Sequence, residues 1–286
     1  MGETLLMTID TVPKLDVFEL SHVGKVREDN QDSVRVCDPN DPINASCGYV
    51  YGIADGMGGY SHGGVASALA LTTFFESFYR STGNQIPQNM RKAVQDANLI
   101  VYQTSQRMGM VRMGTTLTAV NVVGDRLHLA HIGDSRAYLI RDGKASCITN
   151  DHTMVGDLVR MKVLSPDKVR THAQRSTLNK CLGIDLFVQP DITQVPLMPD
   201  DVIILCTDGI WSVIQDEEFA DLTLNTASIS KLPQQLIDLA MERDSDDNVS
   251  AVVIYAESLP EASIDSSTKR SLGLPKFIRS RFSAKF

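Results

Sequence analysis

The sequence predicts an α+β fold, because its strand-like and helical segments come in blocks and do not alternate along the chain. One block holds two long helical patterns in succession, over residues 65–78 and 87–107. The next holds three short β-rich runs, over residues 116–123, 126–132 and 136–140, with Gly-Asp turns between them. Short runs joined by such turns are typical of an antiparallel meander, whereas a doubly wound parallel sheet requires strand and helix to alternate.

The first 60 residues are expected to supply strands that end in polar loops. Residues 17–37 are strand-like on both sides of a polar turn at residues 25–31. Residues 49–54 form a short apolar run that is typical of a buried strand. The run is followed by Asp55-Gly56-Met57-Gly58-Gly59, which we expect to form a tight loop.

Two helices follow from the spacing of apolar residues. Over residues 65–78 the apolar side chains cover a wide arc, which indicates a well-buried helix. The second pattern has Pro87 near its start, where a helix tolerates proline best. Its apolar stripe consists of Met90, Val94, Ala97 and Val101.

Three further elements are predicted after the β-rich block. Residues 202–206 form a strongly apolar strand that ends at Thr207-Asp208-Gly209. Leucines at helical spacing predict a helix over residues 231–243, with Pro233 in its first turn. A last strand is expected over residues 249–255.

We expect one domain over residues 1–260, with a polar insertion at residues 151–174 that contains one helix, over residues 153–163. From residue 261 onward six basic residues face only two acidic ones, a net charge of +4. We therefore expect residues 261–286 to form a flexible basic tail. Its mixture of basic and apolar residues would also suit contact with a protein partner or an anionic membrane.

Composition excludes several classes of protein. The 286 residues are 43% hydrophobic and 22% charged, as in ordinary globular proteins. A net charge of -8 argues against nucleic-acid binding through phosphate neutralisation. No apolar run approaches the ~20 residues of a membrane helix, and the first residues lack the features of a signal peptide. The five scattered cysteines contain no C-x-x-C pair, which favours a reduced, cytoplasmic protein.

Carboxylates recur at the ends of the predicted strands. Asp55, Asp134 and Asp208 each follow an apolar run, and Asp247 precedes one. Any one of them alone is best interpreted as a turn residue, because Asp-Gly is a common turn dipeptide. Four together favour a shared site of hard oxygen ligands, which suits Mg²⁺ or Mn²⁺. Arg27 would be an ordinary surface residue on its own, but its guanidinium could also hold phosphate oxygens bidentately.

Over about residues 18–255 the chain resembles the metal-dependent protein phosphatases of the PP2C (PPM) family. Eight motifs carry the resemblance in the family's order: Gly24-Lys-Val-Arg27-Glu-Asp-Asn30-Gln31-Asp32, Asp55-Gly-Met-Gly-Gly59, Gly114-Thr-Thr116, Gly133-Asp-Ser-Arg136, Thr149-Asn-Asp-His152, Leu182-Gly183, Asp208-Gly-Ile-Trp211 and Asp247-Asn248. A single Asp-Gly pair would be weak support, whereas this ordered set is specific.

The resemblance implies a role for each candidate residue. Asp55 would bridge two Mg²⁺ or Mn²⁺ ions, with the Gly56 carbonyl on the first ion. Asp208 and Asp247 would be the other direct ligands of the second ion. Arg27 would bind the substrate phosphate.

Two further carboxylates have implied roles. Asp32 would orient a metal-bound water, and Asp134 would belong to a third, weaker metal site. The resemblance also implies a four-layer α-β-β-α sandwich with two central antiparallel sheets. The implied reaction is hydrolysis of phosphoserine and phosphothreonine in proteins by a metal-bridged hydroxide, without a covalent phosphoenzyme. Residues 151–174 correspond to the family's flap, and the substrates would be those of a cognate Ser/Thr kinase.

The sequence departs from the broader family pattern at three positions. Gln31 replaces a frequent Glu, and Ser212 replaces an Asp of the third metal site in some members. Met57 stands where animal members have His, as is common in bacterial-type members, and this leaves the proton donor to the leaving group unassigned. His62 is nearby but offset. These departures keep open an alternative, a catalytically weak or inactive module that binds phosphoproteins. We expect a monomer in either case.

Overall fold

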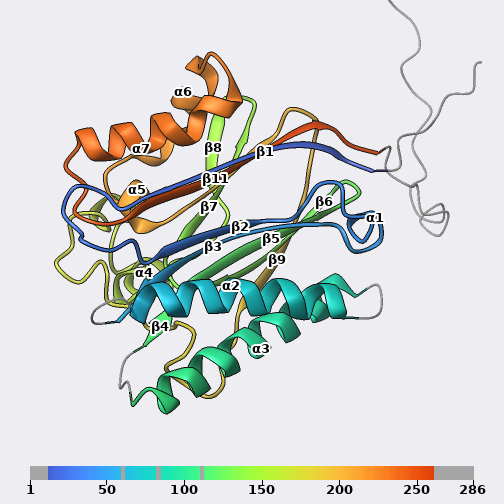
Figure 1. The fold of residues 1–286 in the computed structure, drawn as a ribbon. Coiled ribbons are helices and arrows are strands. Elements are labelled where there is room, and N and C mark those ends of the chain that lie inside the picture. Colours follow the sequence, from blue (N-terminus) through green and yellow to red (C-terminus); the bar gives the residue numbers. More distant parts are fainter. Residues whose placement is uncertain (1–11, 59–61, 82–84, 110–112, 261–286) are drawn as a thin grey trace, which may run out of the picture.

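A computed structural model of the chain shows two antiparallel sheets packed face to face between two layers of helices (Figure 1). It describes residues 12–58, 62–81, 85–109 and 113–260. The α+β prediction and the four-layer sandwich implied by the resemblance are both confirmed. The tail predicted over residues 261–286 lies outside the described residues.

The first sheet joins strands from both ends of the domain. Its order is β1-β11-β10-β7-β8, and all its pairs are antiparallel. Its strands are β1 (Lys14–His22), β7 (Arg136–Arg141), β8 (Lys144–Cys147), β10 (Val202–Cys206) and β11 (Val249–Ser258).

The second sheet has the order β2-β3-β5-β6-β9, and the short β4 pairs with the end of β3. Its strands are β2 (Asp32–Val36), β3 (Tyr49–Met57), β4 (Gly114–Thr115), β5 (Leu117–Val123), β6 (Arg126–Ile132) and β9 (Asp191–Pro196). The space between the two sheets holds much of the larger hydrophobic core.

The helices cover the outer faces, α2 and α3 on the second sheet and α5, α6 and α7 on the first (Figure 1). Their bounds, with those of the short helices, are α1 (Asn44–Cys47), α2 (His62–Arg80), α3 (Ile86–Arg107), α4 (Met154–Arg160), η1 (Pro166–Lys168), α5 (Asp208–Trp211), α6 (Asp216–Asn225), η2 (Ile229–Lys231) and α7 (Leu232–Glu242). None of the described helices combines the length and the apolar character that a bilayer-spanning segment needs.

Both long predicted helices are confirmed. The predicted stripe of α3, from Met90 to Val101, is fully buried against the second sheet and α2. In α2 only part of the predicted arc is buried: Val65 is 43% exposed, whereas the buried members are Ala66, Ala70, Phe74 and Phe78, with Phe74 stacked on Phe78. Each helix therefore forms because it covers an apolar sheet face, as its sequence period predicts.

The predicted three-stranded meander is wrong at its second turn. β5 and β6 pair as expected, but β7 belongs to the other sheet, between β10 and β8. The segment Gly133-Asp134-Ser135 therefore crosses from one sheet to the other. Gly133 has φ +106°, and a Cβ there would lie 2.5 Å from the Thr116 side chain. The same Gly-Asp signal serves a hairpin and a crossing, so the sequence pattern could not separate them.

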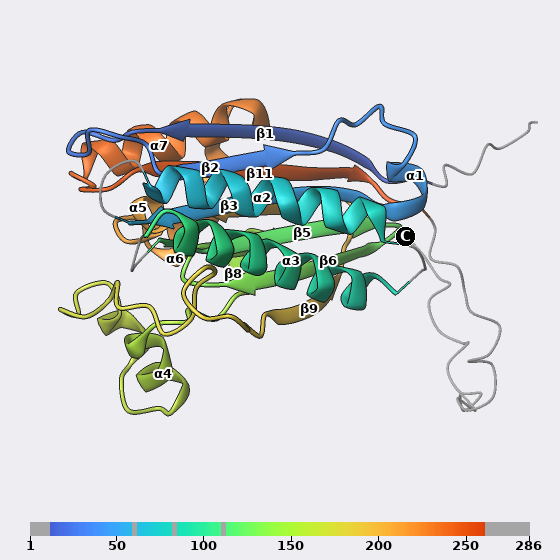
Figure 2. The same ribbon diagram turned by 60° about the horizontal axis from the view of Figure 1, so that its bottom comes forward.

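Smaller differences concern the element bounds. The strand predicted over residues 49–54 continues to Met57, because Gly56 and Met57 pair with β4. The predicted insertion contains α4, which is shorter than expected and begins after Thr153, whose side chain accepts a hydrogen bond from the Gly156 N–H. Figure 2 shows this region projecting from one end of the sandwich. Three elements, β8, β9 and α6, were not predicted from the sequence.

Candidate metal centre

Asp32 and Asp55 lie directly opposite each other on β2 and β3. Opposed residues of an antiparallel pair project to the same face of the sheet. The Asp32 Oδ2 atom accepts hydrogen bonds from the Thr207 hydroxyl (2.8 Å) and the Ser250 hydroxyl (2.7 Å). Ser250 lies on β11 of the other sheet, and Thr207 directly follows β10 of that sheet. Asp32 is therefore held where the two sheets meet.

The main chain around Asp55 is fixed by two threonines. The Asp55 N–H donates to the Thr116 Oγ1 atom (2.8 Å), and the Thr115 hydroxyl donates to the Asp55 carbonyl (2.8 Å). The next residue, Gly56, is closely packed: a Cβ there would lie 2.0 Å from the Gly63 carbonyl oxygen. Only glycine fits this close approach of two backbones.

The other three predicted carboxylates lie at the start of a helix or in connections that lead into strands. Asp208 is the first residue of α5, and only Thr207 separates it from the end of β10. Asp134 lies in the crossing between the sheets, and its carbonyl accepts a hydrogen bond from the Trp211 indole N–H (2.8 Å). Asp247 precedes β11. Trp211 is fully buried, as expected for a core residue.

Electrostatics show that these carboxylates share one environment. Burial, followed by the charges of Asp32, Asp208, Asp134 and Asp247, raises the pKa of Asp55 well above its ordinary value of 3.8. Burial raises the pKa of Asp32 to about 7, with further increases from Asp208 and Asp247. A buried cluster of ionised carboxylates is unfavourable unless a cation binds to it.

Asp208 and Asp134 are perturbed in the same direction. Burial, and then the charge of Asp247, raises the pKa of Asp208 to about 6. Burial, and then the charge of Asp208, raises the pKa of Asp134 well above 3.8. In addition, the buried Oδ1 atom of Asp208 accepts no hydrogen bond from any residue that the structure describes. A buried carboxylate oxygen without a donor is suited to a metal ion.

The donor set fits hard divalent cations that keep part of their water. Within the described part of the chain, no three His, Cys, Asp or Glu side chains are grouped closely enough to hold an ion by themselves. Mg²⁺ is usually bound through one or two carboxylates together with waters. The Asp55 carboxylate, the Gly56 carbonyl and water are therefore a suitable set of ligands for such a cation.

Arg27 lies at the rim of this centre and is about half exposed. Its Nη2 atom is 2.8 Å from Asp247 Oδ2, and its Nε–H donates to the Asp246 carbonyl at 3.2 Å. Arg27, Asp55, Gly56 and Asp247 line a common cavity of about 380 Å³. The structure thus places the predicted phosphate-binding arginine beside the carboxylates, paired with one of them.

Asn248 connects the loop that carries Arg27 to the start of β11. Its side-chain oxygen accepts from the Gln31 N–H (2.8 Å), and its amide donates to the carbonyls of Val23 (2.8 Å) and Asp29 (3.0 Å). From the sequence, Asn248 was expected to hold the Asp247 loop; the contacts of its side chain are with the loop that carries Arg27. The roles of Thr115, Thr116, Thr207 and Ser250 were not predicted, because hydroxyl residues in strands are common and carry no distinctive signal.

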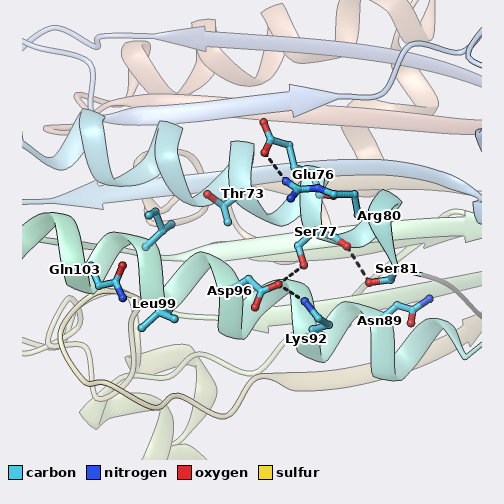
Figure 3. A pocket seen from close by; sticks show the side chains of 11 residues that line it. Thr73, Glu76, Ser77, Arg80, Ser81, Asn89, Lys92, Asp96, Leu99 and Gln103 are labelled. Carbon is cyan, nitrogen blue, oxygen red and sulfur yellow. Dashed lines mark hydrogen bonds and ion pairs between the residues drawn. The ribbon is translucent and has the colours of Figure 1, made fainter.

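A second groove, of about 730 Å³, lies between α2 and α3 (Figure 3). Its charged side chains pair with each other: Arg80 with Glu76, and Lys92 with Asp96, which also accepts from Ser77. These paired charges are typical of two helices packed together. The groove therefore differs from the acidic centre, where carboxylates predominate.

The fold and the site together define an α-β-β-α sandwich protein with an acidic centre suited to divalent cations. The chain belongs to the protein phosphatase 2C family, whose sequence model matches residues 23–240.

Known relatives agree with this assignment. A putative protein phosphatase 2C-type of Streptococcus pyogenes is 29% identical over 239 residues, which cover 82% of this chain and 95% of the relative. The crystal structure of the Mycobacterium tuberculosis serine/threonine phosphatase PstP/Ppp is 33% identical, with a TM-score of 0.76 over 86% of this chain and 100% of that one. The catalytic domain of PstP in complex with two manganese ions is 31% identical, with a TM-score of 0.72 over 85% of this chain and 98% of that one.

Proposed function

We propose that this protein hydrolyses phosphoserine and phosphothreonine esters in proteins and requires two Mg²⁺ or Mn²⁺ ions. Membership of the protein phosphatase 2C family and relatives named as serine/threonine phosphatases support the proposal. The structural observation that carries it is the gathering of Asp32, Asp55, Asp134, Asp208 and Asp247 at one end of the sandwich, where mutual repulsion and burial call for cations.

Asp55, the Gly56 carbonyl, Asp208 and Asp247 are the groups that would hold the two ions. Bound divalent ions supply a water nucleophile at neutral pH and neutralise the charge of a phosphoryl group. The relative with two manganese ions supports the count of two. Asp134, which lies next to Asp208 in a neighbouring cavity, would provide a third and weaker site.

The chain's own residues would position the substrate and water. The Arg27 guanidinium would turn from Asp247 to the phosphoryl oxygens, which it can bind through two parallel N–H donors. Asp32 would orient the attacking water with one carboxylate oxygen, because Thr207 and Ser250 already fix the other. Neither role needs a covalent bond between the protein and the phosphoryl group.

The proposal is tested by hydrolysis of a phosphothreonine peptide with Mn²⁺ or Mg²⁺, using the wild type and Asp208→Ala. Turnover that requires the metal, stops with EDTA and is lost in Asp208→Ala supports it. Activity that EDTA and Asp208→Ala leave unchanged would contradict it. Tight phosphopeptide binding without any metal-dependent turnover would favour a non-catalytic binding module.

The proposal extends to the setting of the enzyme. We place the catalytic domain at residues 1–260, in a cytoplasmic and monomeric protein whose substrates are those of a cognate Ser/Thr kinase. The insertion at residues 151–174 would act as the flap beside the site. The basic tail at residues 261–286 would be an appendage that contacts a partner or an anionic membrane.

A further inference from the structure

A second cavity, of about 570 Å³, shares Asp55 and Met57 with the cavity that Arg27 lines. Asp55, Asp134 and Asp208 form its inner wall. Most of its other lining residues belong to residues 176–185, a segment that takes no part in the proposed binding of metal or phosphate. The cavity is therefore continuous with the candidate centre and bounded by residues outside it.

Ile184 and Asp185, which line this cavity, belong to a segment whose backbone is held firmly, residues 182–188, which we call the ledge. At its start, Leu182 pairs with Thr115 of β4 through two backbone hydrogen bonds, of 3.1 and 2.8 Å. Asn98 of α3 is fully buried and directs its whole amide group at the ledge. Its Oδ1 atom accepts from the Gly183 N–H (2.9 Å), and its Nδ2 atom donates to the carbonyls of Asp185 and Leu186 (3.0 Å each).

The side chains of the ledge contrast with its fixed backbone. Ile184, Leu186 and Phe187 are 39%, 46% and 81% exposed. Large apolar side chains that a monomer exposes close together commonly mark a binding surface. A backbone that is already fixed loses little conformational freedom when a ligand binds, so it is suited to recognition.

We propose that the ledge binds the polypeptide on either side of the phosphorylated residue and selects apolar side chains there. The substrate polypeptide is the expected occupant, because the cavity that the ledge borders extends to the carboxylates at which the phosphate would be hydrolysed. Asp185 lines the same cavity, and its charge disfavours acidic residues beside the phosphoresidue. This inference rests on the proposed function and adds a substrate class to it: phosphopeptides with apolar rather than acidic flanks.

The test compares three substrates under Mn²⁺: a phosphothreonine peptide with Leu and Phe on both sides of the phosphothreonine, the same peptide with Glu at those positions, and p-nitrophenyl phosphate. The wild type is expected to cleave the apolar peptide with a kcat/KM about tenfold above that of the acidic peptide, the scale of one buried apolar side chain. Phe187→Ala and Leu186→Ala should remove most of this preference by raising KM. Their turnover of p-nitrophenyl phosphate should stay unchanged.

Leu224→Ala is the matched control, since Leu224 is an exposed leucine of α6, on the opposite outer face. This variant should leave kcat/KM for all three substrates unchanged. Equal kcat/KM for the two peptides, or a preference that survives both ledge substitutions, would overturn the inference while p-nitrophenyl phosphate turnover upholds the proposed function. Absence of metal-dependent p-nitrophenyl phosphate turnover in the wild type would overturn both. Dissociation of a dimer by Phe187→Ala, with the peptide preference intact, would assign the ledge to self-association and reject substrate binding.

Discussion

Arg27 and Asp247 form an ion pair at the mouth of the acidic centre, with 2.8 Å between Nη2 and Oδ2. The pair joins the proposed phosphate-binding group to a proposed metal ligand. A cation that binds Asp247 would compete with Arg27 for this carboxylate. A phosphate that binds Arg27 would likewise compete with Asp247 for the guanidinium. Metal binding and substrate binding should therefore be coupled through this pair.

The coupling predicts that Arg27→Ala separates metal affinity from activity. Loss of a cation beside Asp247 should leave the Mn²⁺ affinity equal or higher, as measured by isothermal titration calorimetry. Turnover of a phosphothreonine peptide should fall by roughly 100-fold or more, the usual effect of removing a group that stabilises transition-state charge. Lys25→Ala, which removes an exposed pair with Asp244, is the control and should change neither. Weaker Mn²⁺ binding in Arg27→Ala would contradict the coupling.

Asp55→Asn should make the metal-free protein more stable and the metal-loaded protein inactive. The substitution removes one carboxylate from a buried cluster in which each charge opposes the others. Thermal unfolding in EDTA should show a higher Tm than the wild type, and Mn²⁺ should no longer raise the Tm of the variant. Asp221→Asn changes an exposed aspartate of α6 and should leave both values as they are. A lower Tm in EDTA for Asp55→Asn would show that the cluster is not under electrostatic strain.

Asp32 should make the metal-free protein less stable as pH rises. Its folded pKa of about 7 lies above the ordinary 3.8, so the folded state binds the proton more tightly. The stability from this group is complete below pH ~4 and is lost as pH rises through about 7, by at most about 1.4 kcal/mol per pH unit. The difference in unfolding free energy between wild type and Asp32→Asn, measured in EDTA from pH 4 to 8, should follow this curve. A difference independent of pH would refute it.

Asn248→Ala should weaken the hold on the loop that carries Arg27. Three hydrogen bonds to that loop are lost, and unsatisfied buried partners cost about 1–3 kcal/mol each. We expect lower stability in urea unfolding and a higher KM for the phosphopeptide. Asn225→Ala removes a single exposed bond on α6 and serves as the control. An unchanged KM in a folded Asn248→Ala protein would show that the loop holds Arg27 without this residue.

The sequence predicted the elements whose burial follows a simple period. The stripe of α3 and the apolar runs of β10 and β11 appear in the sequence because each covers a core face over its whole length. β9 did not appear, because it is an edge strand in which no residue is fully buried and half of the six residues are polar. The crossing at Gly133 could not be distinguished from a hairpin, since both need a glycine with positive φ.

For the site, the sequence supplied the residue types and the structure supplied their arrangement. The Asp-Gly pairs and the family motifs marked the carboxylates, whereas the opposition of Asp32 and Asp55 depends on the register of β2 and β3. The support of Asp32 by Thr207 and Ser250 arises only when the two sheets pack. The buried Asn98 that fixes the ledge is also invisible in sequence, because its partners are backbone groups more than 80 residues away.

The most direct test of the central claim is titration of the EDTA-stripped protein with Mn²⁺ while hydrolysis of a phosphothreonine peptide is recorded. If the acidic cluster holds the catalytic ions, the stripped protein is inactive and turnover rises to a plateau as two ions bind per chain. Turnover by the stripped protein at the rate of the metal-loaded one would contradict the account.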